Sequence, residues 1–150
     1  VEFANKIGTT IFALRDWRKR ELPLGISLNQ SRHVYTRMDI VIGWLMLNLN
    51  KQYEINLREA HRMAIWSAPY LSAELGLRDR NFCMPGQGID IPDAKGFGIF
   101  AEARNPIFTN NLNELVDLDA GVCTVLSFRE IAAEFPEKLL FELDLVPIKA

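Results

Sequence analysis

The chain has 150 residues, of which 49% are hydrophobic and 24% are charged, and its formal net charge is -2. This composition is typical of globular proteins and excludes disordered, collagen-like and low-complexity chains. The most apolar run, Ile40 to Leu49, has about half of the roughly 20 residues that cross a bilayer, so we expect no membrane span and a cytoplasmic location. A chain of this length folds without metal or disulfide support, and we expect no cofactor.

Two short helices joined by a tight turn are predicted at the N-terminus. Residues 1–7 form the first helix, which ends at Gly8, and Thr9 and Thr10 cap a second helix over 11–20. The apolar residues of the second helix recur at a spacing of three, and its cations lie off that stripe: Ile11, Leu14 and Trp17 against Arg15, Arg18 and Lys19. We therefore expect Leu14 and Trp17 in the core and a basic solvent face.

A hairpin and a third helix follow. Residues 26–35 are polar and read as two short extended pieces around a turn at 29–31. Thr36 and Asp39 have the spacing of a capping box, which opens a helix through about Asn50. This third helix is apolar on more than one face, so either the rest of the chain or a partner subunit must pack on its second face.

A further helix over residues 56–66 begins at the cap Asn56, with Glu59 as its capping-box partner. Pro69 ends or kinks it, and residues 70–77 form another short helix. The apolar surface of the longer helix is expected from Leu57, Ala60, Ala64 and Trp66.

The remainder of the chain is predicted to be a small mixed α/β unit. Residues 84–98 are rich in Gly and Pro and read as a loop, and Ser127 with Glu130 caps a helix over 128–135 that Pro136 stops. Strands are expected at residues 97–101, 107–108, 122–126 and 140–146. The predicted fold class is α+β.

Charge is distributed unevenly along the chain. Residues 1–51 hold eight Lys and Arg against four Asp and Glu, whereas residues 52–150 hold nine against fifteen. A basic first third with an acidic remainder is typical of a small module that meets a polyanion, although chance clustering gives the same balance. We therefore divide the chain into two domains, residues 1–51 and 52–150.

The first third has a characteristic order of elements: helix, turn, basic helix, hairpin, helix, over about residues 1–50. Particular residues recur in this order: Ile7, Gly8, Thr9 and Thr10 in the turn, Ala13 to Trp17 on the second helix, Leu22 and Pro23 beyond it, and Arg32, Tyr35, Thr36 and Asp39 further on. In these features the first third resembles the DNA-binding module of the MerR-type winged-helix regulators. The resemblance implies a winged helix-turn-helix followed by a second domain of another kind.

The function that this pattern predicts is sequence-specific binding of double-stranded DNA by a transcriptional regulator. The second helix would lie in the major groove, and the hairpin wing would follow the sugar-phosphate backbone. The candidate DNA-binding residues are Thr9, Thr10, Ala13, Arg15, Arg18, Lys19, Arg32, His33 and Tyr35. Alternatively, the cations only complement the dipole at the C-terminus of the second helix. Tyr35 either packs in the core or reaches a phosphate with its hydroxyl.

The sequence offers little for catalysis or metal binding, and we expect neither. His61 has no ligand-spaced neighbour, and the loop residues Asp90, Asp93, Asp117 and Asp119 have no evident catalytic partner. The two cysteines, Cys83 and Cys123, fit neither a disulfide framework nor a zinc site, and we expect both to be buried thiols.

Residues 52–150 are expected to form a homodimer, to bind a small-molecule or protein effector, or both. The alternative function is that of a protein-interaction factor, such as an antirepressor, an immunity protein or an assembly protein, in which the helix-turn-helix is scaffold. A basic surface from Arg15 to Arg32 favours the regulator, and an exposed apolar patch around Ile42 and Met46 favours the alternative.

Overall fold

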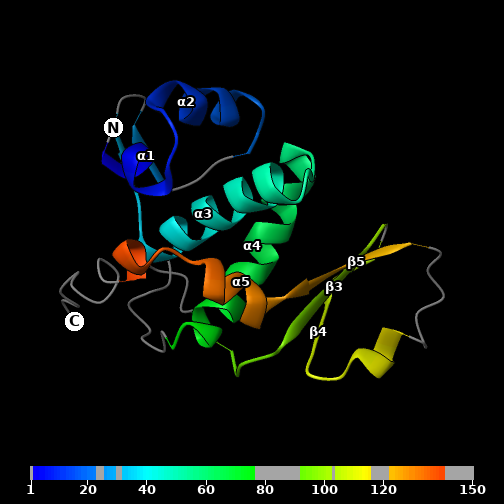
Figure 1. Cartoon of the computed structure of the whole chain (residues 1–150). Coiled ribbons are helices and arrows are strands. Elements are labelled where there is room, and N and C mark those ends of the chain that lie inside the picture. The colour runs from blue at the N-terminus through cyan, green and yellow to red at the C-terminus, as the bar shows by residue number, and fades with distance from the viewer. Residues whose placement is uncertain are drawn as a thin grey trace.

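The computed structural model describes residues 2–22, 26–29, 32–76, 92–102, 104–115 and 122–140. Its fold is α+β, as the sequence predicts. Figure 1 shows helices packed on one another in one half and an antiparallel sheet that extends away from them in the other.

The N-terminal helices follow the predicted boundaries closely. Helix α1 spans Glu2–Ile7 and ends at Gly8, whose positive φ of 82° is a conformation that glycine adopts without strain. Helix α2 spans Ile11–Lys19, and the side chain of its N-cap, Thr10, accepts a hydrogen bond from the backbone N–H of Ala13. Leu14 and Trp17 are buried, which confirms that the stripe at spacing three faces the core.

The hairpin and the capped third helix are also present. Strands β1 (Ile26–Asn29) and β2 (Arg32–Val34) pair antiparallel with a register shift between Ser27 and Asn29. Residues 30 and 31 of the predicted turn lie outside the described residues. Helix α3 spans Arg37–Gln52 and opens with the predicted capping box of Thr36 and Asp39. The Thr36 N–H donates to a carboxylate oxygen of Asp39 at 2.7 Å, and the Asp39 N–H donates to the Thr36 hydroxyl at 3.2 Å.

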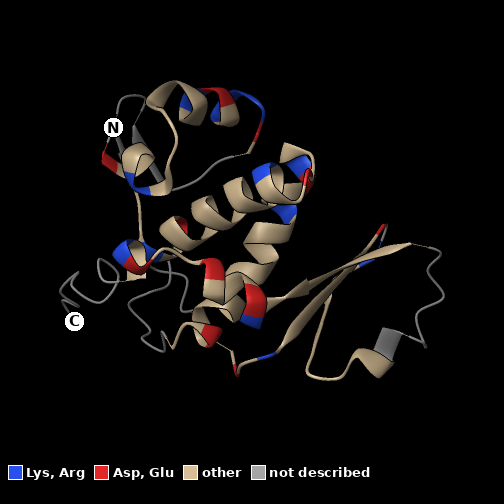
Figure 2. Cartoon of the chain, viewed as in Figure 1, with Lys and Arg blue, Asp and Glu red and all other residues tan. Residues whose placement is uncertain are grey.

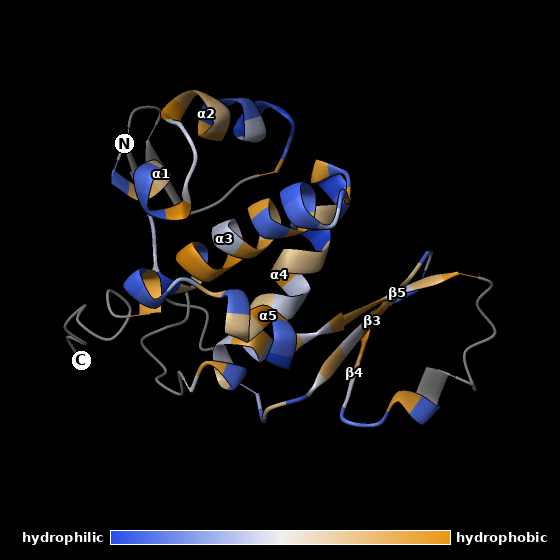
Figure 3. Cartoon of the chain, in the orientation of Figure 1, coloured by the Kyte–Doolittle hydropathy of each residue, from blue (hydrophilic) through white to orange (hydrophobic). Residues whose placement is uncertain are grey.

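Helix α3 is the centre of the core, and the chain itself covers both of its apolar faces. Helices α1, α4 (Leu57–Glu74) and α5 (Phe128–Glu134) surround it (Figure 1). Figure 3 shows the apolar residues that run along α3. Ile42 and Met46 are buried, so the structure gives α3 no second face that needs a partner subunit. The buried cluster also continues across the predicted domain boundary, joining Leu49 of α3 to Ala60 of α4.

Of the two alternatives at Pro69, an end of the helix is wrong, because α4 is one helix from Leu57 to Glu74 with Pro69 inside it, and the separate helix predicted over residues 70–77 is wrong as well. Proline lacks the N–H that would bond to the carbonyl of Ile65, and Ile65 is 44% exposed, so the lost hydrogen bond lies on the solvent side of the helix. Burial of Ala68 and Leu71 holds the helix on both sides of the proline. Trp66, expected to supply core surface, is 47% exposed instead.

The sheet has the order β4-β3-β5, with both pairs antiparallel. Its strands are β3 (Phe97–Ala101), β4 (Ile107–Thr109) and β5 (Cys123–Ser127), close to the predicted ranges, and a 3-10 turn, η2 (Leu112–Leu115), follows β4. Aromatic rings join the sheet to the helices, because Tyr70 of α4 stacks on Phe108 with ring centroids 3.9 Å apart, and Phe108 lies beside Phe128 of α5.

Two further expectations about the C-terminal part are corrected. Leu140, predicted to begin a strand, lies in a helical turn in which its N–H donates to the Pro136 carbonyl at 3.1 Å. Residues 141–146 of that strand, Cys83, and most of the predicted loop lie outside the described residues. Cys123 is half-buried at the start of β5 rather than buried.

Among the described residues, no helix is both long enough and apolar enough to cross a membrane.

Candidate nucleic-acid interface

The solvent face of α2 carries one large apolar residue and several charges. Phe12 is 74% exposed, and Arg15, Asp16 and Lys19 are exposed as well. Positions 12, 15, 16 and 19 have the spacing that places side chains on one side of an α-helix. This face lies opposite the buried stripe of Leu14 and Trp17, so α2 presents it outward.

Charges of both signs alternate on this face, as Figure 2 shows for the second half of α2. The Arg20 guanidinium pairs with the Asp16 carboxylate at 2.9 Å. Neither Arg15 nor Lys19 forms an ion pair with a described residue, so these two cations are the ones that α2 offers to an anion.

Arg18 and Tyr35 are both half-buried, and their side chains meet each other. The Nη2 of Arg18 donates a short hydrogen bond to the Tyr35 hydroxyl. The Tyr35 ring stacks on Phe3 of α1, with centroids 3.9 Å apart and planes at 7°. Of the two interpretations of Tyr35, the structure supports the packed one, and both residues fix α2 to the segment between β2 and α3.

The threonines and Ala13 shape the start of α2. Thr10 is exposed, but its hydroxyl oxygen caps the helix by accepting from Ala13 at 3.1 Å. The Thr9 N–H donates to the Ala4 carbonyl at 2.8 Å and so closes the turn after α1. Ala13 is half-buried and packs against the core. Ala13 therefore presents less surface than Phe12 to a ligand.

Arg32 and His33 lie on β2, the strand of the hairpin that leads into α3. In the antiparallel pair, Arg32 is opposite Asn29 and His33 is opposite Ser27. Their side chains lie outside the described residues, so whether Arg15 and Arg32 share one basic surface stays a prediction.

Two residues of this region, Phe12 and Arg58, were not predicted from the sequence. Phe12 could have been found from its position on the helix face, one turn before Arg15 and Asp16. Arg58 of α4 could not, because it meets α2 only through the fold: its Nη2 donates to the Arg20 carbonyl at 3.3 Å, across 38 residues of sequence.

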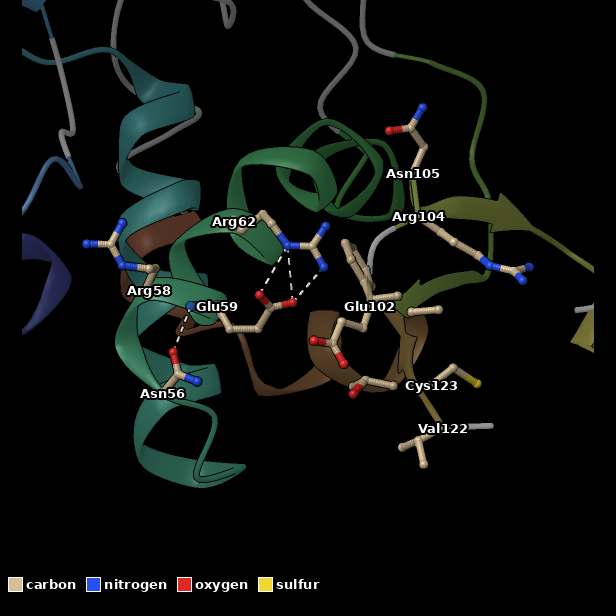
Figure 4. Close-up of a pocket in the computed structure, with 12 residues that line it drawn as sticks. Asn56, Arg58, Glu59, Arg62, Glu102, Arg104, Asn105, Val122 and Cys123 are labelled. Atoms are coloured by element: carbon tan, nitrogen blue, oxygen red, sulfur yellow. Dashed lines mark hydrogen bonds and ion pairs between the residues drawn. The ribbon is translucent and has the colours of Figure 1, made fainter. Parts of the chain in front are cut away.

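A pocket of about 740 Å³ lies between the start of α4 and the edge where β3 ends and β5 begins. Figure 4 shows Arg62 and Glu59 joined on the helix side of the pocket, with Glu102 facing them from the sheet. The shortest N···O distance in the Arg62–Glu59 pair is 2.6 Å, and this hydrogen bond raises the pKa of Arg62 against the opposing effect of burial. The Arg62 guanidinium also lies 5.8 Å from the centre of the Phe100 ring.

No group of three or more metal-ligating side chains gathers among the residues that the structure describes. His61 is buried in α4. Asp93 is exposed, and the other three loop aspartates considered above lie outside the described residues.

Comparison of the chain with protein-family models, with curated proteins and with solved structures found no match.

Proposed function

We propose that this protein is a sequence-specific transcriptional regulator that binds double-stranded DNA through α2 and the β1–β2 hairpin, as a winged helix-turn-helix of the MerR type. The observation that carries the proposal is the Arg18–Tyr35–Phe3 contact, which fixes α2 against the end of the hairpin while leaving Arg15 and Lys19 exposed. A rigid helix that presents, next to a hairpin, exposed cations that pair with no described carboxylate suits a duplex with a phosphate backbone on both sides of the groove.

Each exposed residue of α2 has a chemical role in this proposal. Arg15 and Lys19 bind phosphate oxygens or the acceptor edge of guanine, and Phe12 packs on the methyl group of thymine. Asp16 does not repel the duplex strongly, because Arg20 neutralises it. Arg32 and His33 of the wing are proposed to contact the backbone of the adjacent groove, as the sequence analysis expects.

A homodimer is part of the proposal, although α3 no longer supplies a reason for it. Its support is the specificity argument, since one small winged helix covers few base pairs and two related by a two-fold axis read two half-sites. Light scattering on the full chain tests this directly. A monomer that protects one short, uninterrupted site in footprinting contradicts the dimer.

The surface that would favour the protein-interaction alternative is not exposed. It predicts an exposed apolar patch around Ile42 and Met46, and both side chains lie in the core. A small-molecule effector of residues 52–150 is proposed to occupy the pocket beside Arg62, where charged and amide side chains and a hydroxyl line one space.

The test is fluorescence anisotropy of the full chain with genomic duplexes over a range of salt concentrations. If four to six phosphates are contacted, log affinity falls against log salt with a slope of roughly -4 to -5. Removing one cation with Arg15→Ala or Lys19→Ala should reduce the magnitude of that slope by about 0.9. Arg129→Ala is the matched control, because Arg129 is also exposed but lies on α5, across α3 from α2. A flat salt response, or no binding at low salt, overturns the proposal.

A further inference from the structure

Arg58 places a cation from the acidic part of the chain beside the basic helix. It lies in the first turn of α4, seven residues beyond the predicted domain boundary, and its side chain is exposed. Its Nη2 donates to the carbonyl oxygen of Arg20 at 3.3 Å, at the C-terminal end of α2. The guanidinium therefore contacts the backbone at the end of α2, and the position of this acceptor does not depend on a side-chain rotamer.

The charge of Arg58 is not neutralised within the described part of the chain. Arg58 is one of the residues that line the pocket, but Figure 4 shows its side chain pointing away from Arg62 and Glu102. Glu59, its nearest acidic neighbour in sequence, is already paired with Arg62. No described carboxylate forms an ion pair with Arg58, and one hydrogen bond uses only one of its five N–H groups.

The spacing of the cations suits a phosphate backbone. An α-helix rises about 1.5 Å per residue, so Arg15 and Arg20 are about 7.5 Å apart along the axis of α2. Successive phosphates of one DNA strand are about 3.4 Å apart along the duplex axis. The stretch of α2 from Arg15 to Arg20, at whose end Arg58 donates, is thus about as long as two phosphate intervals.

We propose that Arg58 is a further DNA contact, which binds a backbone phosphate at the C-terminal end of α2 and extends the interface onto α4. This inference rests on the proposed function, because it needs a duplex already docked on α2. The hydrogen bond to Arg20 positions the Arg58 guanidinium, so Arg58 loses little conformational entropy when it binds a phosphate. As a phosphate contact it adds affinity and salt dependence without adding preference among sequences.

The experiment compares Arg58→Gln and Arg58→Lys with the wild-type chain by fluorescence anisotropy on duplexes at several salt concentrations. Glutamine keeps a donor for the Arg20 carbonyl and loses the charge, whereas lysine keeps the charge. We expect Arg58→Gln to weaken binding to all duplexes alike and to reduce the magnitude of the salt slope by about 0.9. Arg58→Lys should keep the wild-type slope, and Arg129→Gln on α5 is the control for a lost surface charge.

The outcomes separate this inference from the proposed function. If the wild-type chain binds with a salt slope that Arg15→Ala reduces, but Arg58→Gln leaves it unchanged, only the Arg58 contact is wrong. If Arg58→Lys loses as much slope as Arg58→Gln, Arg58 is a structural link and not a phosphate ligand. Absence of wild-type binding overturns both proposals. Thermal unfolding of each variant verifies that the fold is retained. If Arg58→Gln does not fold, Arg58→Lys decides the question, because a folded Arg58→Lys protein with weakened binding also refutes the contact.

Discussion

Arg18 and Tyr35, 17 residues apart in the sequence, are joined by a hydrogen bond from the guanidinium Nη2 to the phenol oxygen. The same tyrosine ring stacks on Phe3, and the next residue, Thr36, is the cap of α3. One side chain therefore connects α1, α2 and the start of α3, which fixes how α2 is presented to a ligand.

Replacing Tyr35 by phenylalanine should keep the stacking on Phe3 and remove the acceptor for Arg18. We expect a loss of about 0.5–1.5 kcal/mol in the free energy of unfolding, measured by chemical denaturation, because one partly buried hydrogen bond is lost. Tyr70→Phe is the matched control, since the Tyr70 ring stacks on Phe108 and its hydroxyl has no hydrogen bond to a described residue. Equal stability changes in the two variants would contradict a stabilising role for the Arg18 bond.

Replacing Phe12 by alanine should alter the preference of the protein among DNA sequences more than its overall affinity. In the proposed function this exposed, apolar ring packs on thymine methyl groups, so its removal would leave the proposed phosphate contacts intact. Competition binding with duplexes that carry thymine or uracil at the recognised positions measures the effect. Leu112→Ala removes an exposed apolar residue from η2 and should change nothing. An unaltered thymine-to-uracil ratio in the Phe12 variant would show that this ring does not contact bases.

Replacing Gly98 by alanine should destabilise the protein by about 1–3 kcal/mol through overpacking. A Cβ at this position would lie 2.8 Å from Cζ of Phe128 and 3.2 Å from Cε1 of Phe108, inside the aromatic cluster between the sheet and the helices. Gly96→Ala is the control two residues earlier, where the nearest atom to the new Cβ is 3.7 Å away. Urea unfolding of both variants tests the packing, and similar midpoints would show that the cluster relaxes freely.

Tyr53 provides a prediction for alkaline pH. Burial raises its pKa above 10.0, and so do the hydrogen bond to Glu134 and the negative charges of Glu134 and Glu130. A pKa that is raised in the folded state favours the protonated form, so the stability that it contributes is present below pH 10 and declines as the pH rises above it. Glu134→Gln should lower the pKa of Tyr53 without restoring its ordinary value, because burial remains.

Spectrophotometric titration of tyrosinate measures this pKa, and Tyr53→Phe identifies the signal of Tyr53 among the three tyrosines. An unchanged titration in the Glu134 variant would mean that the 2.9 Å bond from the Tyr53 hydroxyl to Glu134 does not govern the pKa.

Local chemistry in the sequence determined where most of the described elements begin. Thr10, Thr36, Asn56 and Ser127 each cap a helix by accepting a hydrogen bond from an N–H three residues ahead. That interaction involves neighbours only, so spacing alone reveals it. The hairpin and the three strands of the sheet were found for the same reason, since alternation and turn residues are also local. The MerR-type resemblance, the domain boundary and the DNA-binding function stay predictions.

The tertiary structure decided where α4 ends and which residues far apart in the chain come into contact. Helix α4 continues through Pro69 because core burial on both sides outweighs the loss of one hydrogen bond on the solvent side, and the sequence does not show which side that is. The Arg18–Tyr35 and Arg58–Arg20 contacts join residues far apart in the chain, so they exist only once α1, α2, α3 and α4 have packed. Local patterns specify the start and face of a helix, whereas the partner of each face depends on how the helices pack together.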